Sequence, residues 1–162
     1  MSFILPLANV SYTGRKGRAM IRILSVGKLK DPHLAELCAD FSKRIGRWSS
    51  LKIVELKDQD PDREAKAMLQ KLGKGPVHAL DEKGDLLTSR EFSTLLASHG
   101  SPTFLIGGPD GLGAEAKLRA DRLFSLSPLT FTHETARYLL LEQIYRACTI
   151  LRGEPYHKGG GS

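Results

Sequence analysis

From Met20 onward, segments with the apolar pattern of a strand alternate with segments with the apolar pattern of a helix. Short runs rich in β-branched residues are typical of buried strands, and runs with apolar residues three and four apart are typical of helices. The first kind predicts strands over residues 21–26, 51–56, 77–80 and 103–106, and a short extended piece over residues 123–126. The second kind predicts helices over residues 32–45, 61–72, 89–96, 114–121 and 134–151. This alternation predicts one α/β domain with a mostly parallel sheet covered by helices on both faces.

Several of the predicted helices carry start signals. Asp31 and Asp60 each precede a proline, which places a capping side chain before the first helical residue. Thr88 and Glu91 have the spacing of a capping box. The first helix is expected to bury one apolar face, formed by Leu34, Leu37, Cys38, Phe41 and Ile45.

The last helix has more apolar surface than one core-facing side requires. A second stripe, Leu141, Tyr145 and Cys148, lies beside the main one. Such a helix is either fully buried or packs against a second subunit. Glu142 and Arg146 are four residues apart and can pair with each other. The main stripe contains Ala136, Leu139, Leu140, Ile144, Ala147 and Leu151.

Three segments follow predicted strands, and we expect them at the carboxyl edge of the sheet, where open α/β sheets bind ligands. They are residues 80–84, 106–113 and 126–131. The middle segment is glycine-rich, so its backbone can approach a ligand closely. It matches neither G-x-G-x-x-G nor the P-loop, and both it and residues 123–131 lack Lys and Arg. A polyphosphate normally requires cations, so the loops favour a weakly charged ligand such as an adenosine.

Each loop also has a plainer interpretation. Gly107 and Gly108 can serve only to allow positive φ in a tight turn. Residues 123–131 can form a buried strand that closes the sheet. Pro128 fits a central strand poorly, because proline cannot donate to the ladder, so a turn that lines a pocket explains it better.

Composition and charge agree with one soluble domain. The chain has 162 residues, of which 41% are hydrophobic and 26% charged, which excludes a disordered or fibrous protein. The net charge of +6 comes from residues 1–30, which hold six basic residues and no acidic one. A nucleic-acid partner is therefore compatible with the charge but not required by it.

The two ends of the chain differ in composition from the residues between them. Residues 1–19 place basic residues after an apolar stretch, the reverse of a secretory signal, so we expect a disordered extension or a start assigned too early. Residues 159–162, Gly-Gly-Gly-Ser, are expected to be a flexible tail, which leaves residues 20–158 as the domain. No uncharged apolar run approaches the roughly 20 residues that a membrane span needs. Cys38 and Cys148 form no disulfide framework and indicate a reducing compartment, the cytoplasm.

Other candidate sites are less specific. The five histidines are scattered without metal-ligand spacing, so no metal is expected. Asp81 and Glu82 follow a strand as a ribose-binding acid does, but one acidic pair is common. A basic cluster at a helix end either complements the helix dipole or contacts RNA; it contains Lys43, Arg44, Arg47 and Trp48.

Several phrases occur together in one order. They are Ile23–Lys28 (ILSVGK), Leu80–Gly84 (LDEKG), Leu105–Leu112 (LIGGPDGL), Ser125–Thr130 (SLSPLT), Arg137–Ala147 (RYLLLEQIYRA) and Pro155–His157 (PYH). In this combination, the chain resembles the ribosomal RNA large subunit methyltransferase H family, a SPOUT-class family, over residues 20–158.

The resemblance implies a homodimeric, S-adenosylmethionine-dependent enzyme with a C-terminal trefoil knot. The family methylates N3 of a pseudouridine in 23S rRNA on assembled ribosomes. On the acceptor side, the resemblance implies roles for Arg137, Tyr156 and His157. It implies cofactor contacts at Leu80, Gly107, Gly108, Leu126, Ser127, Pro128, Leu129, Thr130 and Phe131.

The expected reaction is attack of N3 on the methyl group of the cofactor, which the protein promotes by alignment. The N3 proton must be lost, either to a general base or because the imide anion is stabilised. His157 is the candidate base and Arg137 the candidate anion stabiliser, although Arg137 taken alone also fits a structural role. Two other functional classes are considered for this protein. One is a non-catalytic RNA-binding or ribosome-binding module, and the other is a dinucleotide oxidoreductase, which the cation-free loops disfavour.

Overall fold

The computed structural model describes residues 19–98 and 100–158. The expectations for residues 1–18 and for the tail at 159–162 lie outside this range. The elements, in chain order, are β1 (Met20–Val26), α1 (Pro32–Ile45), β2 (Ser50–Leu56), α2 (Pro61–Leu69), β3 (Val77–Leu86), α3 (Ser89–Ala97), β4 (Thr103–Ile106), α4 (Ala114–Arg119), β5 (Arg122–Ser125) and α5 (His133–Arg152).

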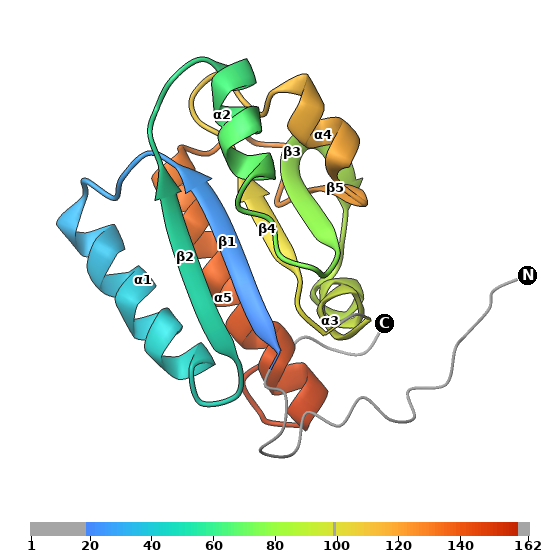
Figure 1. Cartoon of the computed structure of the whole chain (residues 1–162). Helices are drawn as coiled ribbons and strands as arrows, with labels where there is room; N and C mark the ends of the chain where they lie inside the picture. The colour runs from blue at the N-terminus through green and yellow to red at the C-terminus, as the bar shows by residue number, and fades with distance from the viewer. Residues whose placement is uncertain (1–18, 99, 159–162) are drawn as a thin grey trace, which may run out of the picture.

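The five strands form one parallel sheet in the order β2-β1-β4-β3-β5. Helices α1, α3 and α5 pack over one face, and α2 and α4 over the other (Figure 1). This confirms the α/β prediction with both faces covered. The strand β4 lies inside the sheet and is buried throughout, whereas β2 lies at an edge and is mostly half-buried. The knot implied by the resemblance stays a prediction.

The helix starts follow the local signals. Asp31 accepts hydrogen bonds from the backbone of His33 and Leu34, and Thr88 and Glu91 form the expected capping box. The helix α1 buries Cys38, Phe41 and Ile45. The expectation that Leu37 is buried is wrong: it lies at the border of this face and is 42% exposed.

Two elements differ in length from the prediction. The helix α2 ends at Leu69 rather than at residue 72, because the chain then turns and the Gly73 N–H reaches the hydroxyl of Thr103, the first residue of β4. The strand β3 continues to Leu86 rather than ending at residue 80. Phe124 of β5 pairs with both Leu80 and Asp85, so residues 81–84 bulge out of the ladder and pairing then resumes.

The helix α5 lies between α1 and α3 on the same face of the sheet (Figure 1). Leu141 and Cys148 of its second apolar stripe are therefore buried within the chain, and Tyr145 packs on Phe41 of α1. The first alternative, burial, accounts for the two-sided helix. The homodimer stays a prediction that needs other support.

Candidate functional site

The three expected loop segments converge on a cleft of about 520 Å³ at the carboxyl edge of the sheet. A cleft of this volume suits a nucleoside-sized ligand. Pro128, one of the expected cofactor contacts, is exposed and does not line it. The other eight do line it: Leu80, Gly107, Gly108, Leu126, Ser127, Leu129, Thr130 and Phe131.

The glycine-rich loop folds back on itself. The Gly111 N–H donates to the Gly108 carbonyl at 3.0 Å, and Gly111 has a φ of 78°. Gly107 and Gly108 have no positive φ, so the interpretation that they are present for that reason is wrong. Close approach explains them instead, strictly at Gly107 and less strictly at Gly108. A Cβ on Gly107 would lie 2.7 Å from the carbonyl carbon of Gly111, and one on Gly108 would lie 3.0 Å from Val26.

Residues 126–131 form a turn rather than a strand that closes the sheet, since β5 ends at Ser125. The Ser125 hydroxyl donates to the Ser127 carbonyl at 2.7 Å, and the Leu129 N–H donates to the Ser127 hydroxyl at 3.1 Å. The Thr130 hydroxyl donates to Glu82 at 3.1 Å. This last bond ties the turn to the bulge of β3 across the cleft.

The cleft is slightly acidic. Three acidic residues line it, and the cations are Lys83 and Lys117. The sequence interpretation missed Lys117, which α4 brings to the cleft from outside the three loops. Lys117 lies 2.8 Å from Asp81, whose side chain is only 10% exposed, and this hydrogen bond holds the pKa of Asp81 below its usual value. With Lys117 paired, Lys83 is the remaining cation beside three acidic residues, so the cleft suits a pyrophosphate poorly and is compatible with a cationic sulfonium.

His133, the first residue of α5, also lines the cleft and was not predicted as a site residue. Its Nε2 atom is buried and has no hydrogen-bond partner among the described residues. The ring packs against Gly27, where a Cβ would lie 2.8 Å from Nε2 and where φ is 83°. The residue after β1 is therefore glycine because of its positive φ, and its lack of a side chain leaves room for the first residue of α5.

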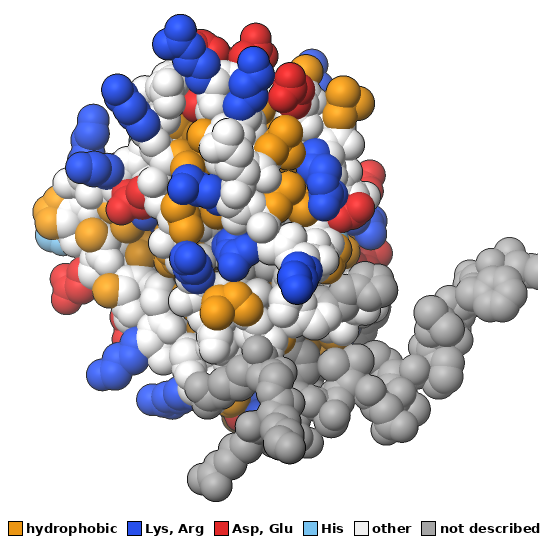
Figure 2. Space-filling view, viewed as in Figure 1, with side chains coloured by type: hydrophobic (Ala, Val, Ile, Leu, Met, Phe, Trp, Pro, Cys, Tyr) orange, Lys and Arg blue, Asp and Glu red, His pale blue; other side chains and the backbone are white. Residues whose placement is uncertain are grey.

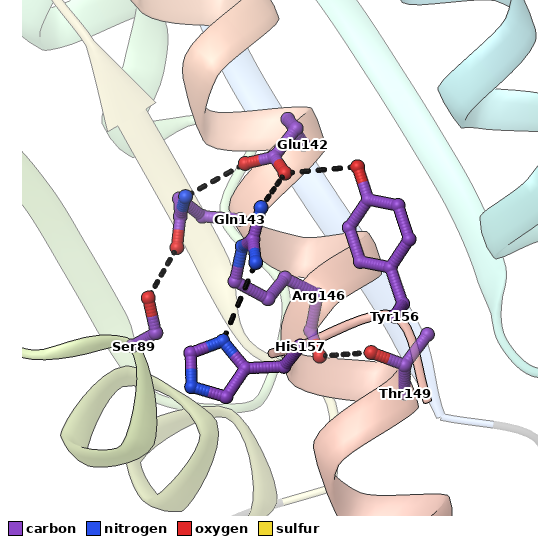
Figure 3. A network of polar contacts seen from close by, with 7 residues as sticks. All are labelled: Ser89, Glu142, Gln143, Arg146, Thr149, Tyr156 and His157. Carbon is purple, nitrogen blue, oxygen red and sulfur yellow. Dashed lines mark hydrogen bonds and ion pairs between the residues drawn. The ribbon is translucent and has the colours of Figure 1, made fainter. Parts of the chain in front are cut away.

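A second polar group lies on the outer side of α5 (Figure 3). Arg146 donates to Glu142 through one nitrogen, and through the other it lies 3.3 Å from Nδ1 of His157. The Tyr156 hydroxyl donates to Glu142 at 3.1 Å, and burial, with the nearby carboxylate of Glu142, raises the pKa of Tyr156. The segment after α5 therefore turns back along the helix. The i,i+4 spacing predicted the Glu142–Arg146 pair, but nothing local indicated that Tyr156 and His157 would join it.

Arg137 lies apart from this group. Its side chain is 3% exposed, and Nη2 lies 3.0 Å from the Gly27 carbonyl and 3.4 Å from a Glu55 carboxylate oxygen. It contacts neither Tyr156 nor His157 and does not line the cleft. In this structure Arg137 ties α5 to the carboxyl ends of β1 and β2.

We expect Arg137→Met to lower the free energy of unfolding by about 2 kcal/mol, because it removes a buried charged donor from the Gly27 carbonyl and from Glu55. The measurement is urea unfolding followed by circular dichroism. Arg63→Met is the control, because the Arg63–Asp60 pair is exposed and should contribute less than about 1 kcal/mol. A variant with wild-type stability and lost methylation would instead support the role in the reaction that the resemblance implies.

The basic cluster at the end of α1 is packed against the protein itself. Arg44 pairs with Asp40 at 2.8 Å and lies over the Tyr145 ring, and Trp48 stacks on Tyr145 with ring centroids 5.5 Å apart. This favours the structural interpretation of Arg44 and Trp48. Within residues 19–98 and 100–158, the structure contains no group of three or more potential metal ligands and no helix long and apolar enough to cross a membrane. Cys38 and Cys148 are buried free thiols, and burial raises the pKa of Cys148 to about 12.

Comparison with known proteins agrees with the geometry. Among solved structures, the fold resembles a probable methylase family protein from Haemophilus influenzae, with a TM-score of 0.53 and 12% identity over 88% of this chain and 71% of that one. Proteins named ribosomal RNA large subunit methyltransferase H are much more similar in sequence. The one from Syntrophotalea carbinolica is 43% identical over 85% of this chain and 97% of its own.

Two further relatives of the same name extend this similarity. The protein from a Synechococcus species is 45% identical over 85% of this chain and 95% of its own. The one from Caldicellulosiruptor bescii is 38% identical over 86% of this chain and all of its own. The family model described as a predicted SPOUT methyltransferase matches residues 19–157. The loops, the cleft and this match over nearly the whole described range lead to one conclusion: the chain belongs to the SPOUT methyltransferases.

Proposed function

We propose that this protein transfers the methyl group of S-adenosylmethionine to N3 of a pseudouridine in 23S rRNA on assembled ribosomes, in the cytoplasm. The coarser activity, S-adenosylmethionine-dependent methylation of ribosomal RNA, follows from the family and from relatives named as methyltransferases of the large subunit RNA. The observation that carries the proposal is the cleft, in which eight of the nine expected cofactor contacts meet.

The cleft fits the cofactor in shape and charge. Gly107 and Gly108 let the loop fold tightly on itself and against Val26, and this folded loop forms one wall of the cleft, on which a flat adenosine can lie. The slight excess of acidic residues suits a ligand with a sulfonium and an amino group but no phosphate. Bound there, S-adenosylmethionine supplies an electrophilic methyl group. The residues of the three loops would hold and align it.

The polar group on α5 is the proposed acceptor side. Arg146 can only donate, so the Nδ1 atom of His157 that faces it accepts, and the neutral ring then carries its proton on Nε2. In this arrangement His157 is a donor that can stabilise the charge of the imide anion. Glu142 is the carboxylate of the group and a second candidate for accepting the N3 proton.

A homodimer would unite the two halves of the site. Tyr156 and His157 do not line the cleft of their own chain. In a symmetric dimer, the segment after α5 of one protomer can meet the cleft of the other, and the same contact occurs twice. Because the cleft and these two residues lie apart within one chain, the site itself supports the proposed dimer. The second apolar stripe of α5 does not, since it is accounted for by packing within the chain.

The function is tested by incubating the protein and labelled S-adenosylmethionine with ribosomes that lack the modification. Mass spectrometry of the 23S rRNA nucleosides should show the label in one N3-methylated pseudouridine. Label in another nucleoside would overturn the proposed position. The absence of label from all rRNA would overturn the activity.

Calorimetry distinguishes the other classes. A non-catalytic module with this fold would bind ribosomes but not S-adenosylhomocysteine, whereas the enzyme should bind it. A dinucleotide oxidoreductase would bind NAD, which the slightly acidic cleft disfavours.

A further inference from the structure

Basic residues collect at the edge of the sheet opposite the cleft. Arg22 of β1 and Lys52 of β2 are register partners. Both lie on the face covered by α2, because Leu24, two residues after Arg22, and Leu56, four residues after Lys52, pack in the core on that face. The Arg22 guanidinium donates to the Lys71 backbone carbonyl at 3.5 Å. We call the basic residues of this edge the amino-edge patch; it contains Arg22, Lys52, Lys71 and Lys74.

The charges of the amino-edge patch are uncompensated. None of the ion pairs among the described residues involves its four members. The Nε atom of Arg22 is buried without a hydrogen-bond partner in the part of the chain that the structure describes. Like charges directly opposite on neighbouring strands are destabilising, so the Arg22–Lys52 arrangement has a cost that a bound anion would remove. Figure 2 shows Lys and Arg side chains close together in the middle of this face.

The patch continues into a groove at the amino ends of β3 and β5. Lys74 lines this groove together with Arg119 and Arg122. Arg119 lies 3.8 Å from Asp121, and Arg122 lies 3.2 Å from Asp85, so these two arginines are partly neutralised. Because neighbouring strands lie about 4.8 Å apart, the row of cations from β2 to β5 follows the sheet edge over roughly 20 Å. An extended polyanion fits such a row better than a single small anion does.

We propose that the amino-edge patch binds phosphate groups of ribosomal RNA away from the target nucleotide. This inference rests on the proposed function, since it takes rRNA as the substrate. The slightly acidic cleft does not itself attract a phosphate backbone, and Arg44 at the end of α1 is paired within the protein. Phosphate contacts position a protein on RNA and supply most of the salt-dependent affinity.

The test is a double charge reversal at exposed lysines, Lys52→Glu with Lys74→Glu, which leaves the partly buried Arg22 in place. The matched control is Lys57→Glu with Arg90→Glu, which changes the charge equally at exposed positions after the carboxyl end of β2 and on α3, away from the amino edge. Binding to ribosomes that lack the modification is measured by filter retention at several salt concentrations. Turnover and S-adenosylhomocysteine binding are measured in parallel.

The patch variant should bind ribosomes roughly ten-fold more weakly, with the slope of log K against log salt shallower by about 1.5, because two phosphate contacts are lost. Its KM should rise while kcat and S-adenosylhomocysteine affinity stay unchanged. Equal weakening in the control, or no weakening in the patch variant, would overturn the inference. A wild-type protein that binds ribosomes but methylates nothing would refute the proposed function alone, since the patch is judged by binding.

Discussion

Replacing Gly107 with alanine is expected to abolish measurable binding of S-adenosylmethionine. The new Cβ would lie 2.7 Å from the carbonyl carbon of Gly111 and 2.9 Å from the Leu112 nitrogen. Both neighbours are backbone atoms of the same loop, so the loop has to open and can no longer line the cleft in its present form. We expect affinity for S-adenosylhomocysteine to fall at least about 100-fold and stability by about 1–3 kcal/mol. Calorimetry and urea unfolding measure the two effects.

Gly100→Ala is the control for Gly107→Ala. A Cβ at Gly100 meets no atom of the described residues within 4 Å, so this variant should bind and unfold like the wild type. Wild-type affinity in Gly107→Ala would mean that the cofactor does not depend on the shape of this loop. The placement of the cofactor in the cleft would then be wrong.

The second large effect is expected from His157→Ala. If His157 donates to the imide anion, its loss should lower kcat about 100-fold, the usual effect of removing one such donor. S-adenosylhomocysteine affinity should stay unchanged, because the expected cofactor contacts belong to the three loops and His157 is proposed to face the acceptor base. Single-turnover methylation of ribosomes measures the rate. His33→Ala, at an exposed position of α1, is the control.

His157→Gln separates the two roles considered for this residue. An amide can donate a hydrogen bond but does not take up a proton near neutral pH. Partial recovery of the rate would support the donor role that the Arg146 contact favours. A rate as low as that of His157→Ala, together with loss of the acid limb of the pH profile, would support the general base expected from the resemblance.

Mixing the two variants tests the dimer. The Gly107→Ala protomer should lack a functional cleft, and the His157→Ala protomer should lack the acceptor-side group. If each site takes its cleft from one protomer and His157 from the other, a mixed dimer keeps one complete site. After subunit exchange, about one quarter of wild-type activity should return. No recovery, with exchange verified by mass spectrometry, would mean that each site is built from one chain.

Much of the fold followed from signals between residues close in sequence. Asp31 caps α1, and Thr88 with Glu91 caps α3, because capping depends on side chains within one turn of the helix start. The prediction of β4 at residues 103–106 matched the structure because a run buried on both faces is apolar throughout. The site loops could also be predicted, since the carboxyl ends of parallel strands share one edge.

Other features depended on pairs of residues far apart in the chain. Lys117 pairs with Asp81, His133 packs on Gly27, and Arg137 pairs with Glu55. The periodicity of neighbouring residues predicts none of these contacts. Phe124 extends β3 by pairing with it twice. The spacing of residues along one segment shows which side chains share a face, and this is why sequence predicted the elements and the loops, whereas the family followed from a resemblance of ordered phrases. Which faces meet depends on how the layers pack, so only the folded chain placed Arg137 in a structural contact and collected the four cations at the amino edge.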